Sequence, residues 1–96
     1  MNLRVPKLLR LANGESCVMC GAEDGTIVWA HSNLLDHGKG TSIKAHDPMG
    51  AFLCRECHFQ YDQGGKMSRT ELREFILTAI ARTHLRLWQT GKVGLL

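Results

Sequence analysis

The clearest hydrophobic pattern lies near the C-terminal end, where apolar residues recur every three or four positions. A capping box precedes them, because the Ser68 hydroxyl can accept from the Glu71 amide while the Glu71 side chain reaches back to Ser68. The pattern predicts a helix over about residues 69–90, with Gly91 as its stop. Its first apolar face consists of Leu72, Phe75, Ile76, Ala79, Ile80 and Leu87.

Earlier in the chain, two short apolar runs predict strands. Residues 26–31, "TIVWAH", and residues 50–53, "GAFL", are rich in apolar, β-branched or aromatic side chains. Shorter helices are predicted over residues 4–12 and 55–63. The polar, glycine-containing residues 32–49 predict a long loop, which in so small a domain is usually functional.

Length and charge add a bound on size and a hint about partners. With 96 residues the chain makes one domain, residues 1–96, around a single small core. The formal net charge is +3, and the basic residues gather at the two ends while the middle is near neutral. This distribution favours a polyanionic partner, with ordinary solvated surface as the alternative.

The chain carries no pattern that predicts membrane insertion. Its start lacks the apolar run of about 7–15 residues that a secretory signal needs. An apolar stretch of about 18 residues, which a membrane span needs, occurs nowhere. We therefore expect a cytoplasmic protein without a membrane partner, which disfavours structural disulfides and c-type haem attachment.

Four cysteines form two Cys-x-x-Cys pairs: Cys17, Cys20, Cys54 and Cys57. The spacing lets both thiolates of a pair bind one tetrahedral ion, so two pairs complete a closed structural zinc site. One pair on a turn and one at the start of a helix are typical of a treble-clef zinc module. Dithiol redox chemistry and iron–sulfur binding are the alternatives, whereas haem attachment would leave the first pair unused.

Two histidines and an aspartate make up a second constellation. Four sulfur ligands would saturate the zinc and leave His58 free, and Asp62 lies on the same helical face one turn later. His31 ends the first predicted strand, so a hairpin followed by a helix would bring the three together. A histidine facing a histidine–carboxylate metal site suits hydrolysis. A plain surface hydrogen bond between His58 and Asp62 is the alternative.

The segments "CVMCG", "AHS" and "LCRECH" together resemble the HNH (ββα-metal) endonucleases. The chain is most similar to the small prophage-encoded HNH-like nucleases of the YbcO type, through its length, basic start, Gly/Thr/Lys loop and long last helix. The resemblance implies an α+β fold with a treble-clef zinc module and ββα-metal core over about residues 15–65. It covers nearly the whole chain.

The resemblance also implies roles for individual residues. His31 matches the general base that activates water, and His58 matches a ligand of a catalytic Mg²⁺ or Mn²⁺ ion. Asp62 stands where some members have a second ligand. Such enzymes leave a 5′-phosphate and a 3′-hydroxyl.

Two positions depart from the family pattern. Ala30 replaces the acidic residue before the base, and Met49 stands where the central Asn is expected. Asp47 is the foremost substitute, as a metal ligand or as the group that orients His31. His46 and Asn33 are the lesser candidates.

Basic side chains are expected to contact the phosphates of a nucleic acid rather than read its bases. The candidates are Lys39, Lys44, Arg55, Arg69 and Arg73. For the two lysines, a solvated loop is the alternative interpretation. The substrate is expected to be DNA, with RNA left open.

The last helix has a second apolar stripe, composed of Leu77, Ala81, Leu85 and Trp88. A helix that is apolar on two sides must bury both. The N-terminal leucines or a second copy of the chain would cover this stripe. We favour a homodimer, because two nicking sites could then address two DNA strands.

The sequence thus predicts a divalent-metal-dependent DNA endonuclease with structural zinc. A non-catalytic zinc-binding adaptor for DNA or protein is the second interpretation, and a dithiol oxidoreductase is the third.

Overall fold

The computed structural model describes residues 1–96 and has an α+β fold, which confirms that part of the predicted fold class. Every predicted helix and strand is present, with ends within two residues of those predicted. The elements are α1 (Pro6–Leu11), β1 (Val28–His31), η1 (Leu35–His37), β2 (Gly50–Leu53), α2 (Arg55–Asp62), α3 (Arg69–Gln89) and η2 (Lys92–Leu95).

Two elements begin later than predicted, for local reasons. β1 starts at Val28 because Thr26 closes a turn instead, with its amide and hydroxyl both donating to Asp24 Oδ1. α1 starts at Pro6, since proline suits the first helical position and residues 2–5 are hydrogen-bonded to the long loop.

The two strands form an antiparallel hairpin at the centre of the domain. Its register pairs Trp29 with Phe52 and His31 with Gly50, and the two aromatic rings meet edge to face at 5.3 Å. A Cβ at position 50 would lie 2.3 Å from the Trp29 indole nitrogen. Glycine is therefore required opposite His31.

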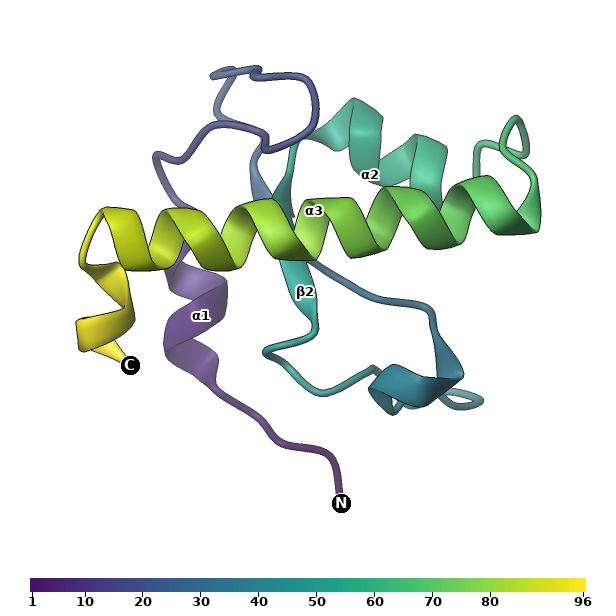
Figure 1. The fold of residues 1–96 in the computed structure, drawn as a ribbon, viewed down its shortest axis with the longest axis horizontal. Helices are drawn as coiled ribbons and strands as arrows, with labels where there is room; N and C mark the ends of the chain where they lie inside the picture. The colour runs from purple at the N-terminus through teal and green to yellow at the C-terminus, as the bar shows by residue number, and fades with distance from the viewer.

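α3 lies across one face of this hairpin (Figure 1). Its buried side chains are Ile76, Ala79, Ile80, Thr83 and Leu87. Leu72 and Phe75 of the predicted first face are partly buried against the same core. The Thr83 hydroxyl accepts from the Phe52 amide at 3.2 Å and so satisfies a buried backbone donor of β2. The predicted capping box is present, with both hydrogen bonds between Ser68 and Glu71 formed.

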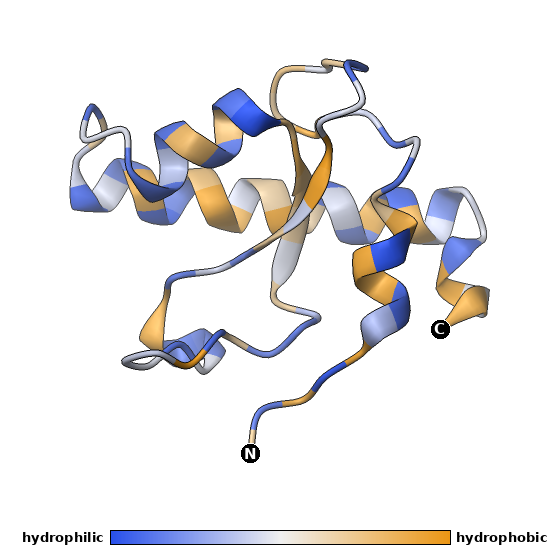
Figure 2. Ribbon diagram, turned by 180° about the vertical axis from the view of Figure 1, so that it is seen from behind, coloured by the Kyte–Doolittle hydropathy of each residue, from blue (hydrophilic) through white to orange (hydrophobic).

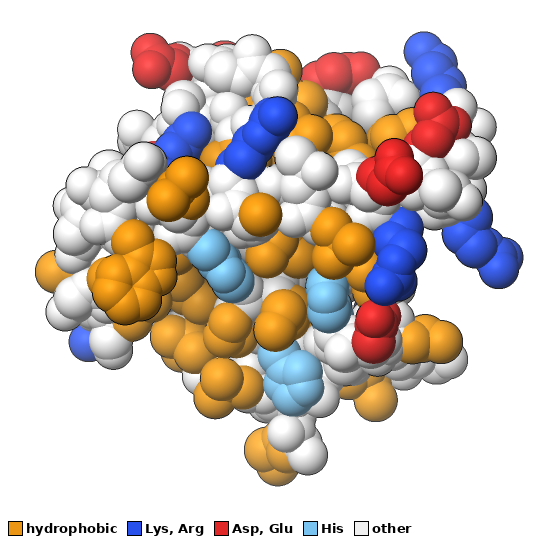
Figure 3. All heavy atoms as spheres, in the orientation of Figure 1, with side chains coloured by type: hydrophobic (Ala, Val, Ile, Leu, Met, Phe, Trp, Pro, Cys, Tyr) orange, Lys and Arg blue, Asp and Glu red, His pale blue; other side chains and the backbone are white.

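The second apolar stripe of α3 is not covered by the N-terminal leucines. Leu77, Leu85 and Trp88 are 39%, 57% and 71% exposed, respectively. Leu8 is the buried leucine of α1 and packs in the core. Figure 3 shows hydrophobic side chains at the surface over the C-terminal half of α3.

The other face of the hairpin is not crossed by any helix (Figure 2). α1, α2 and the long loop between the strands surround it. No helix combines the length and the apolar character that crossing a bilayer requires.

Candidate functional site

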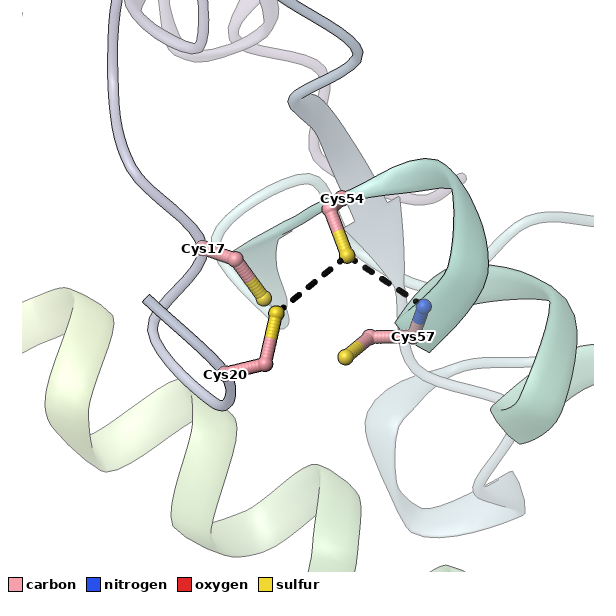
Figure 4. A group of neighbouring side chains, drawn as sticks. All are labelled: Cys17, Cys20, Cys54 and Cys57. Atoms are coloured by element: carbon pink, nitrogen blue, oxygen red, sulfur yellow. Dashed lines mark hydrogen bonds between the residues drawn. The ribbon is translucent and has the colours of Figure 1, made fainter. Parts of the chain in front are cut away.

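The four cysteines come together at one end of the hairpin (Figure 4). Their sulfur atoms all lie within 4.8 Å of one another, and the Sγ atoms of Cys20 and Cys54 are 3.5 Å apart. Zinc–sulfur bonds of about 2.3 Å place the sulfurs of a tetrahedron about 3.8 Å apart. The cluster therefore has the size of a tetrahedral site and can hold a metal ion such as zinc.

Backbone contacts fix the two halves of this cluster. Cys54 is the N-cap of α2 and its sulfur accepts from the Cys57 amide at 3.4 Å. The turn that carries Cys17 and Cys20 is tied to β2, because the Val18 amide donates to the Phe52 carbonyl at 3.0 Å. The turn is thus hydrogen-bonded to β2, and β2 leads directly into α2.

The chemistry of the thiols also fits a cation. Burial raises the pKa of Cys57, and the neighbouring thiols raise it further. Burial likewise raises the pKa of Cys54. For Cys17, burial raises the pKa, but hydrogen bonds from nearby amides outweigh it and bring the pKa to about 7. Several adjacent thiolates repel one another, so a bound cation is needed for all four to ionise.

A second group of polar side chains lines a cleft of about 310 Å³ on the open face of the hairpin. His31 enters from β1, and His58 and Asp62 enter from one face of α2, so the predicted convergence of these three residues on one cleft is present. The ligand atoms do not form a compact cage, since the four cysteines are the only such cluster in the chain. The remaining lining residues are Leu9, Trp29, Ser32, Asn33, Lys39 and Lys44.

Asp47 is in direct contact with His31. Its Oδ1 lies 2.7 Å from His31 Nε2 and also accepts from Arg4 at 2.8 Å, while Oδ2 accepts from the Val5 amide at 2.6 Å. The carboxylate is buried, with 5% of its side chain exposed. Both oxygens are engaged inside the protein, so Asp47 is placed to orient His31 and not to bind an ion in the cleft.

The charge state of Asp47 sets the tautomer of neutral His31. Burial raises the pKa of Asp47, but hydrogen bonds from His31, the Val5 amide and Arg4 outweigh it and lower the pKa below its usual value. An ionised carboxylate only accepts hydrogen bonds, so His31 Nε2 carries the proton. The Nδ1 atom of His31 is then left with a free lone pair.

Asn33 and His46, the lesser candidates for the role of Asp47, have other hydrogen-bond partners. Asn33 Nδ2 donates to Asp62 Oδ1 at 2.8 Å, which ties the long loop to α2 at the edge of the cleft. His46 Nδ1 accepts from the Leu3 amide at 2.9 Å and holds the N-terminal residues. Neither side chain contacts His31 through a hydrogen bond.

Only part of the predicted nucleic-acid contacts lie at the cleft. Lys39 and Lys44 line it. Arg69 and Arg73 line a neighbouring hollow of about 560 Å³, where Arg73 pairs with an exposed aspartate of η1. Arg55 lies in the first turn of α2 beside the cysteines, at the opposite end of that helix from Asp62.

Arg4 is the residue of the site that sequence reasoning missed. It was visible only as one of several basic residues near the N-terminus. Its contact with Asp47 joins residues 43 positions apart, and no local spacing indicates such a pair.

Comparisons of the chain with protein-family models, with curated proteins and with solved structures give no match. What the protein does is therefore inferred from its own residues.

Proposed function

We propose that the protein is a divalent-metal-dependent endonuclease that hydrolyses phosphodiester bonds in DNA. The observation that supports it most is the His31–Asp47 pair, 2.7 Å apart, at a cleft that also contains His58, Asp62 and two lysines. An imidazole oriented by a buried carboxylate is a general base. Cationic side chains beside it suit a phosphate.

In the proposed reaction, His31 Nδ1 removes a proton from water. The resulting hydroxide attacks phosphorus and the bond to the 3′-oxygen breaks, which leaves a 5′-phosphate. The departing 3′-oxygen takes a proton from a solvent water and becomes the 3′-hydroxyl. Asp47 keeps the imidazole oriented and stabilises it once it is protonated. Lys39 and Lys44 hold the phosphate oxygens in place.

His58 and Asp62 are the residues proposed to hold the catalytic ion. Mg²⁺ keeps several waters and commonly takes only one or two protein carboxylates together with substrate phosphates, so an open pair of ligands is adequate. When bound, the ion would stabilise the charge that develops on the phosphate. Asn33 assists by orienting the Asp62 carboxylate through its amide.

The cysteine cluster has a structural role in this proposal. Zinc would join the turn at Cys17 and Cys20 to the start of α2, as in a treble clef. α2 would then present His58 and Asp62 to the cleft at a fixed angle to the hairpin that carries His31. The two metals would then be held by the same helix, since His58 directly follows Cys57 and Asp62 lies one turn later.

Supercoiled plasmid is the direct test of the proposed function. We expect the wild-type protein to nick it with Mg²⁺ or Mn²⁺ and to leave ligatable 5′-phosphate ends. His58→Ala should need at least about tenfold more metal for half-maximal nicking, because it removes a ligand. Lys66→Ala, which changes an exposed charge in the turn after α2, is the control for metal dependence.

The outcome of this assay separates the two leading functions. An absence of nicking with any divalent ion, with DNA binding retained, would exclude the endonuclease and favour a zinc-binding adaptor. Cleavage of RNA in place of DNA would retain the chemistry but change the substrate.

We also propose a homodimer through α3. Its exposed stripe is symmetric about Ala81, since Leu77 and Leu85 lie four residues to either side. If a second copy of α3 crossed antiparallel at Ala81, Leu77 of each helix would meet Leu85 of the other. This pairing suits a two-fold interface. Light scattering at micromolar concentration should give twice the chain mass, and Leu85→Glu should reduce it to one chain. A wild-type monomer would contradict the proposal.

A further inference from the structure

The first residues of the chain form a strap across the long loop. We call residues 2–5 the N-terminal strap. Its backbone pairs with the loop through Leu3, whose carbonyl accepts from the Asp47 amide at 2.9 Å. Asn2 Nδ2 donates to the carbonyls of Gly38 and Lys44 at 2.8 and 2.7 Å. The strap therefore spans the loop that contributes both cleft lysines.

Arg4 is the centre of these contacts. Its guanidinium donates to the Ala45 carbonyl at 2.6 Å, the Lys44 carbonyl at 2.8 Å and Asp47 Oδ1 at 2.8 Å. The two carbonyls and the carboxylate belong to neighbouring residues, and the planar fork of arginine reaches all three at once. Lysine has a single ammonium group and cannot reproduce that geometry.

Asp47 is held from several directions at once. The Trp29 indole donates to the Asp47 carbonyl at 2.7 Å, which attaches this part of the loop to β1. The Val5 amide and Arg4 hold the carboxylate from the strap. The remaining partner of the carboxylate is His31. The strap and β1 together determine where the carboxylate can point.

We infer that Arg4 is a positioning residue of the site, and that the N-terminal strap is part of the machinery that orients His31. The inference rests on the proposed endonuclease function. Arg4 does not contact the substrate in this scheme. It keeps the Asp47 carboxylate ionised and turned toward His31 Nε2, so that Nδ1 remains the basic nitrogen.

Without Arg4, the carboxylate loses the donor that shares Oδ1 with His31. Asp47 can then rotate toward the Val5 amide alone, and neutral His31 becomes a mixture of its two tautomers. A displacement of about 1 Å in a catalytic group can cost about 100-fold in rate. We expect Arg4→Ala to lower kcat for plasmid nicking by about 10- to 100-fold, and Arg4→Lys to lower it less.

Two measurements on the full chain test this inference. The first is kcat and KM for plasmid nicking in wild type, Arg4→Ala, Arg4→Lys and Arg10→Ala. Arg10 lies on α1 and its loss removes the same charge from the same end of the chain, so it controls for attraction of the DNA. The second is the tautomer of His31, read from nitrogen chemical shifts of ¹⁵N-histidine-labelled protein. It needs no substrate.

We expect wild type and Arg10→Ala to have the proton of His31 on Nε2, and Arg4→Ala to show both tautomers with reduced kcat. An Arg4→Ala protein that melts earlier but keeps both its kcat and the Nε2–H tautomer would overturn the inference, since Arg4 would then be merely structural. If wild type does not nick DNA, the proposed function fails, while the tautomer measurement still decides whether Arg4 orients His31.

Discussion

Removal of the ion from the cysteine cluster is expected to unfold the protein. A domain of 96 residues has a single core, here a cluster of 16 buried residues, and domains of this kind have unfolding free energies of about 5–15 kcal/mol. Binding of a structural zinc ion contributes about 10–16 kcal/mol to such small folds. The loss is thus comparable to the whole stability of the domain.

The structural effect of losing the ion would extend beyond the cysteines. The turn between Cys17 and Cys20 bonds to β2 through Val18, and the Val18 carbonyl accepts from Arg82 of α3 at 3.1 Å. A further carbonyl of this segment, that of Ser16, accepts from Arg86 at 2.6 Å. Without the ion, no bond would join the turn to α2 at the cysteines, and the contacts between the turn, the hairpin and α3 would be weakened.

Circular dichroism with a strong chelator is the measurement. The helical signal should disappear and return when zinc is added back, and the protein as purified should contain one zinc ion per chain. Chelator already saturated with zinc is the control. Cys54→Ser should be unfolded or bind zinc far more weakly. A cooperative melting transition that the chelator leaves unchanged would contradict the structural role of the ion.

The second large effect is expected for His31. Replacement of His31 by alanine should lower the nicking rate by about 10²- to 10⁴-fold, the usual contribution of a general base. The imidazole is the one group in the cleft that is oriented by a buried carboxylate. Folding should change little, because His31 lies at the end of β1 and is partly exposed.

His37→Gln is the matched control for this variant. His37 lies in η1, six residues after His31, but it hydrogen-bonds to the Ser32 hydroxyl at 2.7 Å, and glutamine preserves a polar partner there. Both variants should melt like the wild type and bind DNA with similar affinity. If His31→Ala nicks as fast as His37→Gln, His31 is not the base, even if the protein cleaves DNA.

Much of the fold was predictable from local patterns. The capping box at Ser68 and Glu71 indicated where α3 begins. The recurrence of apolar residues every three or four positions identified the face that α3 buries. The short apolar runs at residues 26–31 and 50–53 identified both strands. Such signals are readable because helix caps and side-chain periodicity depend on residues within a turn or two of one another.

The cysteine cluster was predictable for a related reason. A tetrahedral ion restricts the type and spacing of its ligands, so two Cys-x-x-Cys pairs predict the cluster without knowledge of the fold. The structure brings all four sulfur atoms together as that prediction requires.

The surroundings of His31 could not be decided in the same way. Asp47 was only one of several candidates and two roles were open to it, because a loop of mixed polar residues has no periodicity. Arg4 was not identified at all. The role of Asp47 and the part played by Arg4 both depend on contacts between residues more than 15 positions apart.

By itself, the sequence determined the helices and strands, the four cysteines that can hold a metal ion, and the His31, His58 and Asp62 side chains that share a cleft. Only the tertiary structure decided that Asp47 faces inward to His31 and that the N-terminal strap secures it. It also showed that the N-terminal leucines leave the second stripe of α3 exposed. The physical reason is that hydrogen bonds of a buried carboxylate go to whichever donors the fold brings within 3 Å, whatever their distance along the chain.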